Sequence, residues 1–107
     1  MRDYAKLAKN ILEAHKLAKD AIRGMSDGGT CNFDSVQLPC LPRERGSKLL
    51  GAVHAAGCSG FCYTGRSRSV LITPPGGQGA TRTKAAEVMA KHLQECGHRA
   101  WTWYQMD

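Results

Sequence analysis

Apolar positions recur along residues 3–25 at the spacing of one helical face. They lie alternately three and four residues apart, and they are Tyr4, Leu7, Ile11, Ala14, Ala18, Ala21 and Met25. Because this spacing keeps apolar side chains on one side of an α-helix, it predicts a long amphipathic helix that ends near Gly24. We therefore expect residues 1–26 to form an N-terminal helix and residues 27–107 to form the domain. The helix either docks on this domain or pairs with a second subunit.

After this helix, short apolar runs alternate with two further stretches of helical spacing. Strands are predicted over 30–38, 61–64, 69–73 and 99–106, and helices over 43–56 and 82–96. The resulting order, β-α-β-β-α-β, is typical of the ferredoxin-like fold, in which two helices cover one face of a four-stranded antiparallel sheet. We therefore predict an α+β protein with a ferredoxin-like domain after the long N-terminal helix. The other face of the sheet is open unless that helix or a second subunit covers it.

Length and charge narrow the classes of partner. A chain of 107 residues fits one small domain, and its 15 Lys and Arg against 9 Asp and Glu give a formal charge of +6. A positive balance suits an anionic partner, such as nucleic acid, a phosphorylated ligand or an acidic protein surface. No apolar run approaches the roughly 20 residues of a membrane span, and the N-terminus lacks the pattern of a secretory signal. We therefore expect a cytoplasmic protein without a membrane partner.

Five cysteines, at positions 31, 40, 58, 62 and 96, bear on redox state and metal binding. Their odd number and the lack of a Cys-x-x-Cys pair indicate free thiols in a reducing cytosol. A zinc site would use His54, Cys58 and Cys62, with Cys96 or His98 as a fourth ligand. Because this half-site lacks the second closely spaced ligand pair of structural zinc sites, we expect no metal and no cofactor.

The segment before the last predicted helix combines glycines with hydroxyl groups and an arginine. Its candidate ligand-binding residues are Gly76, Gly77, Gln78, Gly79, Thr81, Arg82 and Thr83. Glycines let backbone N–H groups approach a ligand closely, and a helix N-terminus adds free donors and a partial positive charge that favour phosphate. The spacing matches neither a Walker A loop nor the dinucleotide-binding fingerprint. The segment is therefore either a phosphate site or a plain turn capped by Thr81 or Thr83.

A second polar segment lies before the first predicted strand. Its candidate ligand-binding residues are Asp27, Thr30, Asn32 and Asp34, whose carboxylates, hydroxyl and amide suit ribose hydroxyls or base edges. Their spacing does not match the ligand pattern of a calcium loop. The alternative is structural, with Asp27 and the two following glycines in a turn and Asn32 bonded to nearby backbone.

Trp101 and Trp103 alternate along the last predicted strand and therefore point to the same face of the sheet. On an open face they would form a platform on which bases stack, with Arg66, Arg68 and Arg99 close by. On a covered face they would belong to the core, and we expect core burial of at least one of them. The chain lacks the Gly-Phe-x-Phe type signature of RNA-recognition domains.

Three patterns along the chain resemble a known group of proteins. They are the run from Asp27 to Asp34 (DGGTCNFD), Gly77-Gln78-Gly79 with Arg82-Thr83, and the ending from Tyr104 to Asp107 (YQMD). In these patterns the chain is similar to small phage and prophage proteins of gut bacteria, and the similarity extends from the first helix to the last residue. The resemblance implies a viral protein in a host bacterium. Small basic phage proteins without catalytic motifs are often inhibitors of host defence, so an anti-defence role is the expectation by analogy.

Within that setting we expect a protein that sequesters a phosphorylated nucleotide signalling ligand. It would not be an enzyme, because no histidine has a companion nucleophile or carboxylate at a recognisable spacing. The two glycine segments, Arg82 and the aromatic strand would form the pocket, and the protein would act as an oligomer, expected to be a dimer. The alternative is an anti-CRISPR-like inhibitor that blocks a host defence nuclease complex by protein contact. A plain nucleic-acid-binding accessory protein is a third hypothesis.

Overall fold

The computed structural model describes residues 2–26, 28–29, 32–64 and 68–105. In these ranges the chain forms three helices and four strands, in the order α1 (Tyr4–Ala21), β1 (Ser35–Pro39), α2 (Gly46–Ala55), β2 (Gly60–Tyr63), β3 (Ser69–Ile72), α3 (Ala80–Glu95) and β4 (Trp101–Trp103). Each predicted element is present at its expected place in this order, although the first and last strands are shorter than predicted. Helix α1 begins where the side chain of Asp3 accepts a hydrogen bond from the N–H of Lys6, which is the usual N-cap contact.

Each strand of the sheet runs antiparallel to its neighbours, in the order β2-β3-β1-β4. Ile72 of β3 lies opposite Val36 of β1 on one side and opposite Gly60 of β2 on the other. Since β3 is antiparallel to both β1 and β2, these two strands run parallel to each other with β3 between them. The α+β class, the antiparallel sheet and the N-terminal helix are therefore as predicted.

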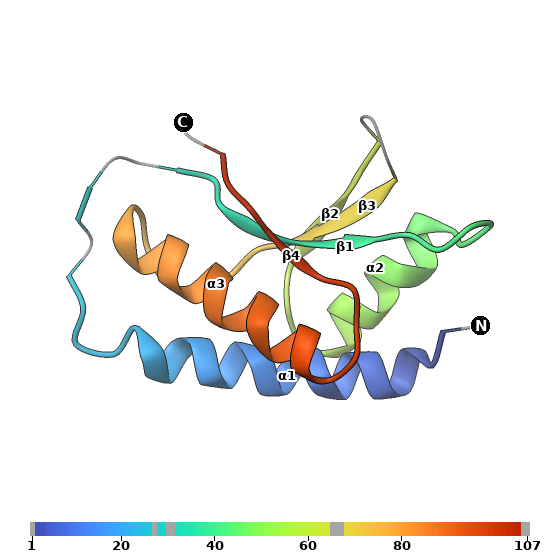
Figure 1. Cartoon of the computed structure of the whole chain (residues 1–107), viewed down its shortest axis with the longest axis horizontal. Helices are drawn as coiled ribbons and strands as arrows, with labels where there is room; N and C mark the ends of the chain where they lie inside the picture. The colour runs from blue at the N-terminus through green and yellow to red at the C-terminus, as the bar shows by residue number, and fades with distance from the viewer. Residues whose placement is uncertain (1, 27, 30–31, 65–67, 106–107) are drawn as a thin grey trace.

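The helices form two layers on one side of the sheet (Figure 1). Helices α2 and α3 pack against the strands, and α1 packs against both of these helices on the side away from the sheet. The suggestion that the N-terminal helix covers the open face of the sheet is therefore wrong. No helix in the described part of the chain is long and apolar enough to cross a membrane.

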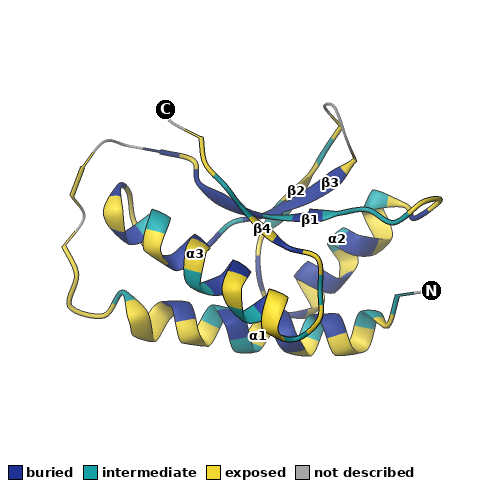
Figure 2. Cartoon of the chain, viewed as in Figure 1, coloured by how far each residue is buried: buried dark blue, intermediate teal, exposed yellow. Residues whose placement is uncertain are grey.

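The hydrophobic core lies between the sheet and the helices, and α1 contributes to it (Figure 2). Alternation along β1 and β3 places Val36 and Ile72 in this core together with Leu38 and Val70. The helices supply fully buried side chains that include Leu7, Ile11, Leu49, Val53, Met89 and Leu93. Burial of each such side chain contributes roughly 1.5–3 kcal/mol. The apolar stripe of α1 therefore packs within the chain from Leu7 to Ala18, whereas Ala21 and Met25 are exposed.

Candidate functional site

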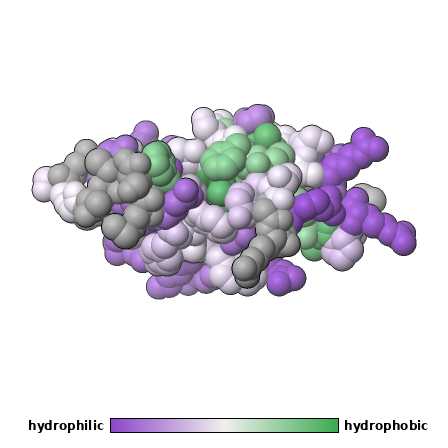
Figure 3. Space-filling view, turned by 90° about the horizontal axis from the view of Figure 1, so that it is seen from above, coloured by the Kyte–Doolittle hydropathy of each residue, from purple (hydrophilic) through white to green (hydrophobic). Residues whose placement is uncertain are grey.

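A row of side chains crosses all four strands on the face of the sheet that points away from the helices. Phe61 lies opposite Leu71, and Leu71 lies opposite Gln37. Gln37 in turn lies opposite Trp101. Directly opposed residues point to the same face, and Val36 beside Gln37 points into the core, so the whole row lies on the open face. Phe61 is 52% exposed and Trp101 is 44% exposed, and Figure 3 shows apolar surface over this face.

Two further aromatic rings lie on the same face. Tyr63 stands two residues after Phe61, and Trp103 stands two residues after Trp101, so alternation puts them on the open side. Their ring centroids are 4.9 Å apart, at an interplanar angle of 57°. Leu71, in the middle of the row, is only 2% exposed. We call Phe61, Tyr63, Trp101 and Trp103 the open-face aromatics.

The expectation that at least one of the two tryptophans is buried in the core is wrong. Trp101 is exposed and Trp103 is half-buried. Alternation puts both on the side of Gln37, whereas the buried side chain of Ala100 lies on the side that the helices cover. Sequence reasoning also missed Phe61 and Tyr63, although their spacing in β2 repeats that of the tryptophans in β4.

Positive side chains gather at one end of the sheet. The guanidinium carbon of Arg99, just before β4, lies 5.4 Å from the centre of the Trp101 ring, a cation–π contact. Arg68 directly precedes β3 and is exposed, while Arg66 lies outside the described residues. Pro39 at the end of β1 lies opposite Ser69 at the start of β3, so the loop after β1 reaches the same end. Hydrophilic side chains project from this end in Figure 3.

The loop between β1 and α2 adds positive charge around a surface hollow. The hollow has a volume of about 570 Å³ and is lined by Arg2, Tyr4, Leu41, Pro42, Arg43, Glu44, Arg45 and Lys48. Four of these residues are cationic and one is acidic, so the hollow favours anions. Arg43 has a φ of 66°, a left-handed conformation that few residues other than glycine adopt. Sequence reasoning did not find this hollow, because Arg2 and Tyr4 lie 42 and 40 residues before Glu44.

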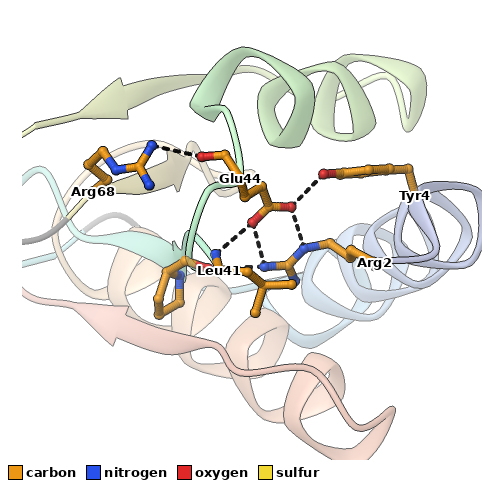
Figure 4. A network of polar contacts seen from close by, with 6 residues as sticks. Arg2, Tyr4, Leu41, Glu44 and Arg68 are labelled. Carbon is orange, nitrogen blue, oxygen red and sulfur yellow. Dashed lines mark hydrogen bonds and ion pairs between the residues drawn. The ribbon is translucent and has the colours of Figure 1, made fainter.

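The carboxylate of Glu44 organises this loop (Figure 4). Its side chain is 4% exposed and accepts hydrogen bonds from Nε and an Nη of Arg2 at 2.8 and 2.9 Å. The hydroxyl of Tyr4 donates to it at 2.6 Å, and the N–H of Leu41 donates at 2.8 Å. Burial by itself would raise the pKa of Glu44, but these hydrogen bonds and the charge of Arg2 outweigh burial and lower the pKa from 4.5 to about 2. The backbone oxygen of Glu44 also accepts from Arg68 at 2.7 Å, which ties the loop to β3.

The two polar segments singled out in the sequence meet at the start of α3. The N–H of Ala80 donates to the backbone oxygen of Gly28 at 2.7 Å, and Gly79 precedes the helix with a φ of 63°. The amide of Asn32 donates to the backbone oxygen of Gly79 at 3.1 Å and lies 3.2 Å from Oγ1 of Thr83. The chain itself therefore occupies part of the helix N-terminus at which we expect an anion.

Asp34 links the same helix start to the C-terminal strand. The hydroxyl of Thr83 donates to one carboxylate oxygen of Asp34 and the N–H of Gln105 donates to the other, both at 2.7 Å. Nε of Arg82 donates to the backbone oxygen of Asp34 at 2.8 Å. Burial lowers the pKa of Arg82, and the charge of Asp34 opposes that effect. The three patterns that carry the phage resemblance are thus joined by hydrogen bonds within the chain.

The remaining candidate residues of these segments have separate positions. Gly76, Gly77 and Gln78 are exposed, and the hydroxyl of buried Thr81 donates to the backbone oxygen of Gln78 at 3.1 Å. Asp27 and Thr30 lie outside the described residues. The contact of Thr81 is of the kind expected for a capped turn, and anion binding by the exposed glycines stays a prediction.

The residues of the considered zinc half-site do not form a ligand group in the described part of the chain. His54 and Cys62 are exposed, whereas Cys58 is buried and its Sγ lies 3.9 Å from the backbone oxygen of Ala56. Burial raises the pKa of the Cys58 thiol, which favours the unreactive protonated form.

No family model, curated protein or solved structure matches the chain.

Proposed function

We propose that this protein binds single-stranded nucleic acid on the open face of its sheet. The observation that carries the proposal is the row from Phe61 to Trp101, with exposed aromatic side chains at its two ends. Exposed aromatic rings on a sheet give bases a surface on which to stack, and stacking is tolerant of sequence because every base has a π-face. The row crosses three strand spacings, about 14 Å, which is wider than one base and suits a strand of two or more nucleotides.

The distribution of charge supports the same ligand. The described strands contain no charged side chain, so the aromatic surface itself is neutral. Arg68 and Arg99 flank it, and the cationic hollow that contains Arg43 and Arg45 lies beside the loop after β1. A strand of nucleic acid that stacks its bases on the sheet would direct its phosphates to these cations, as in other surfaces that combine stacking with positive charge.

A second candidate is the sequestration of a nucleotide signalling ligand in an anti-defence role, which the phage resemblance suggests. The exposed Gly76 and Gly77 before α3, together with Arg82 in the first turn of this helix, favour it. An observation against it is that the polar groups of Asn32, Asp34 and Thr83 form hydrogen bonds with one another. These groups are therefore less available to a ligand. Contact with a host defence nuclease, action as a dimer and a location in the bacterial cytoplasm also stay predictions.

Trp101→Ala is expected to weaken binding of a fluorescently labelled oligouridylate by roughly 5- to 150-fold. The physical reason is the loss of one stacked base, which contributes about 1–3 kcal/mol. The measurement is fluorescence anisotropy over a series of salt concentrations, and the wild-type affinity is expected to fall steeply as salt rises, because phosphate contacts release counterions.

Tyr104→Ala is the matched control for this experiment. Tyr104 is an exposed aromatic residue beside β4, but its hydroxyl donates to Glu87 of α3 at 2.6 Å, so it lies toward the helices. We expect this variant to bind the oligouridylate with wild-type affinity. Equal affinities of the wild type and Trp101→Ala would contradict the proposal. Binding of a small nucleotide but not of the oligouridylate would favour the second candidate instead.

We also infer that the four strands with α2 and α3 form a ferredoxin-like unit. What supports this is the element order β-α-β-β-α-β together with two parallel strands, β1 and β2, that are separated by the antiparallel β3. In such a unit the face opposite the helices is available for a ligand, which is where the open-face aromatics lie.

A further inference from the structure

Three metal-ligating side chains meet where α1 packs against α3, far from the open face of the sheet. They are Glu13 of α1, His92 of α3 and Cys96 at the C-terminal cap of α3, and their donor atoms all lie within 4.8 Å of one another. Nε2 of His92 lies 3.3 Å from Oε1 of Glu13 and 3.5 Å from Sγ of Cys96. His92 and Cys96 are four residues apart, so they lie on the same side of the helix end.

The geometry of these contacts differs from that of a catalytic relay. In a nucleophile–histidine–carboxylate relay, the nucleophile and the carboxylate contact different nitrogens of the imidazole ring. Here Glu13 and Cys96 both approach Nε2 of His92. One ring nitrogen cannot donate a proton to the carboxylate and accept one from the thiol at the same time. Three donor atoms that converge in this way have the arrangement that ligands of a single ion require.

Two of the three separations between donor atoms match those of tetrahedral coordination. With bond lengths of about 2.0 Å for nitrogen and oxygen and about 2.3 Å for sulfur, zinc at a tetrahedral angle places N and O about 3.3 Å apart and N and S about 3.5 Å apart. The two contacts of His92 Nε2 are 3.3 and 3.5 Å long. The carboxylate oxygen of Glu13 and Sγ of Cys96 lie within 4.8 Å of each other, and a tetrahedral site would hold them about 3.5 Å apart, so binding one ion requires these side chains to rotate toward each other.

A neighbouring group holds the carboxylate in position. Nδ2 of Asn10, a buried residue one turn earlier on α1, donates to Oε1 of Glu13 at 2.9 Å, and Oδ1 of Asn10 lies 2.8 Å from Nε2 of His98. Outer partners of this kind orient ligands in metal sites.

We propose that Glu13, His92 and Cys96 bind a divalent transition-metal ion, with zinc as the preferred ion and a water molecule as the fourth ligand. A mixed set of carboxylate, imidazole and thiolate matches the ligands that zinc accepts, and three protein ligands leave one position open. The side chains of His92 and Glu13 are 22% and 43% exposed, so solvent reaches this position. The site is independent of nucleic-acid binding and uses none of the open-face aromatics.

The test is a titration of the chelator-treated protein with Co²⁺, which substitutes for zinc and absorbs in the near ultraviolet when a thiolate binds it. We expect a thiolate-to-cobalt band that saturates at one equivalent and disappears when Zn²⁺ is added. Cys96→Ser should abolish the band, and Cys62→Ser, which removes an exposed thiol elsewhere, should leave it unchanged.

A second variant keeps the test decisive if Cys96→Ser folds poorly. Glu13 is partly exposed, and Glu13→Gln is expected to retain the fold by circular dichroism while binding Co²⁺ at least tenfold more weakly. The proposal is overturned if the wild type gives no thiolate band. It is overturned equally if Cys62→Ser loses the band, or if Glu13→Gln binds Co²⁺ with wild-type affinity.

Discussion

Replacing Glu44 with glutamine is expected to lower the free energy of unfolding by roughly 3 kcal/mol at neutral pH. The wild-type carboxylate accepts four hydrogen bonds, two of them from Arg2, whose side chain is only 10% exposed. Glutamine offers one carbonyl oxygen and directs an amide toward the remaining donors, so it leaves the Arg2 charge partly buried and unpaired. Urea denaturation of the wild type and Glu44→Gln at pH 7 measures the difference.

The same residue predicts how stability depends on pH. The pKa of Glu44 is lower in the folded protein, at about 2, than its usual 4.5, so its contribution is complete above about pH 5 and is lost as the pH falls toward 2. The difference between the two pKa values corresponds to a contribution of roughly 3 kcal/mol to the free energy of unfolding. The free energy of unfolding of Glu44→Gln should not show this part of the decrease at acidic pH. Glu87→Gln is the control, because Glu87 is exposed and bonded to exposed Tyr104, and it should change stability by less than about 0.5 kcal/mol. Equal stabilities of Glu44→Gln and Glu87→Gln would contradict the role given to Glu44.

Gly79→Ala is expected to destabilise the protein by roughly 3 kcal/mol or more. Gly79 has a φ of 63° and a ψ of −130°, a conformation that is strained for any residue with a Cβ. A Cβ at this position would also collide with the backbone oxygen of Gly28, which bonds to the N–H of Ala80. The substitution therefore separates the segment around Gly28 from the start of α3, and thermal denaturation measures the loss.

Gly97→Ala is the comparison variant in which a positive φ is strained without a collision. Gly97 also has a positive φ, of 91°, but a Cβ there would meet no atom within 4 Å. We expect the free energy of unfolding of this variant to fall by only about 1–2 kcal/mol, which is the cost of a left-handed conformation for a residue with a Cβ. If both variants lost the same stability, the close packing of Gly28 on α3 would be refuted.

The sequence contains the local features of this fold, since they depend on spacing that is visible within a short window. The three- and four-residue spacing from Tyr4 to Ala18 specifies α1, and the alternation of Trp101 and Trp103 specifies that they share a face. Which face the helices cover depends on packing across the whole chain. For that reason the alternation was predictable, and the exposure of the tryptophans was not.

The hydrogen bonds at the polar sites were likewise not predictable from local sequence patterns. Asn32, Arg82 and Thr83 could be selected as ligand-binding candidates from their chemistry, but the sequence does not reveal that these groups bond across the chain. Glu44 depends on Arg2, 42 residues earlier, and Glu13 contacts His92, 79 residues later. Contacts over such separations follow from the packing of α1 on the rest of the fold, and no spacing rule indicates them.

Binding on the open face is tested most directly by a nuclear magnetic resonance titration of ¹⁵N-labelled protein with the oligouridylate. Each tryptophan gives its own indole N–H signal, and in this chain Trp101 and Trp103 both lie on the open face. We predict that the largest shifts occur in these two indole signals and in the backbone amides of β2 and β4. Unchanged indole signals at saturating oligouridylate, with shifts confined to α1 or to the start of α3, would contradict nucleic-acid binding on the open face.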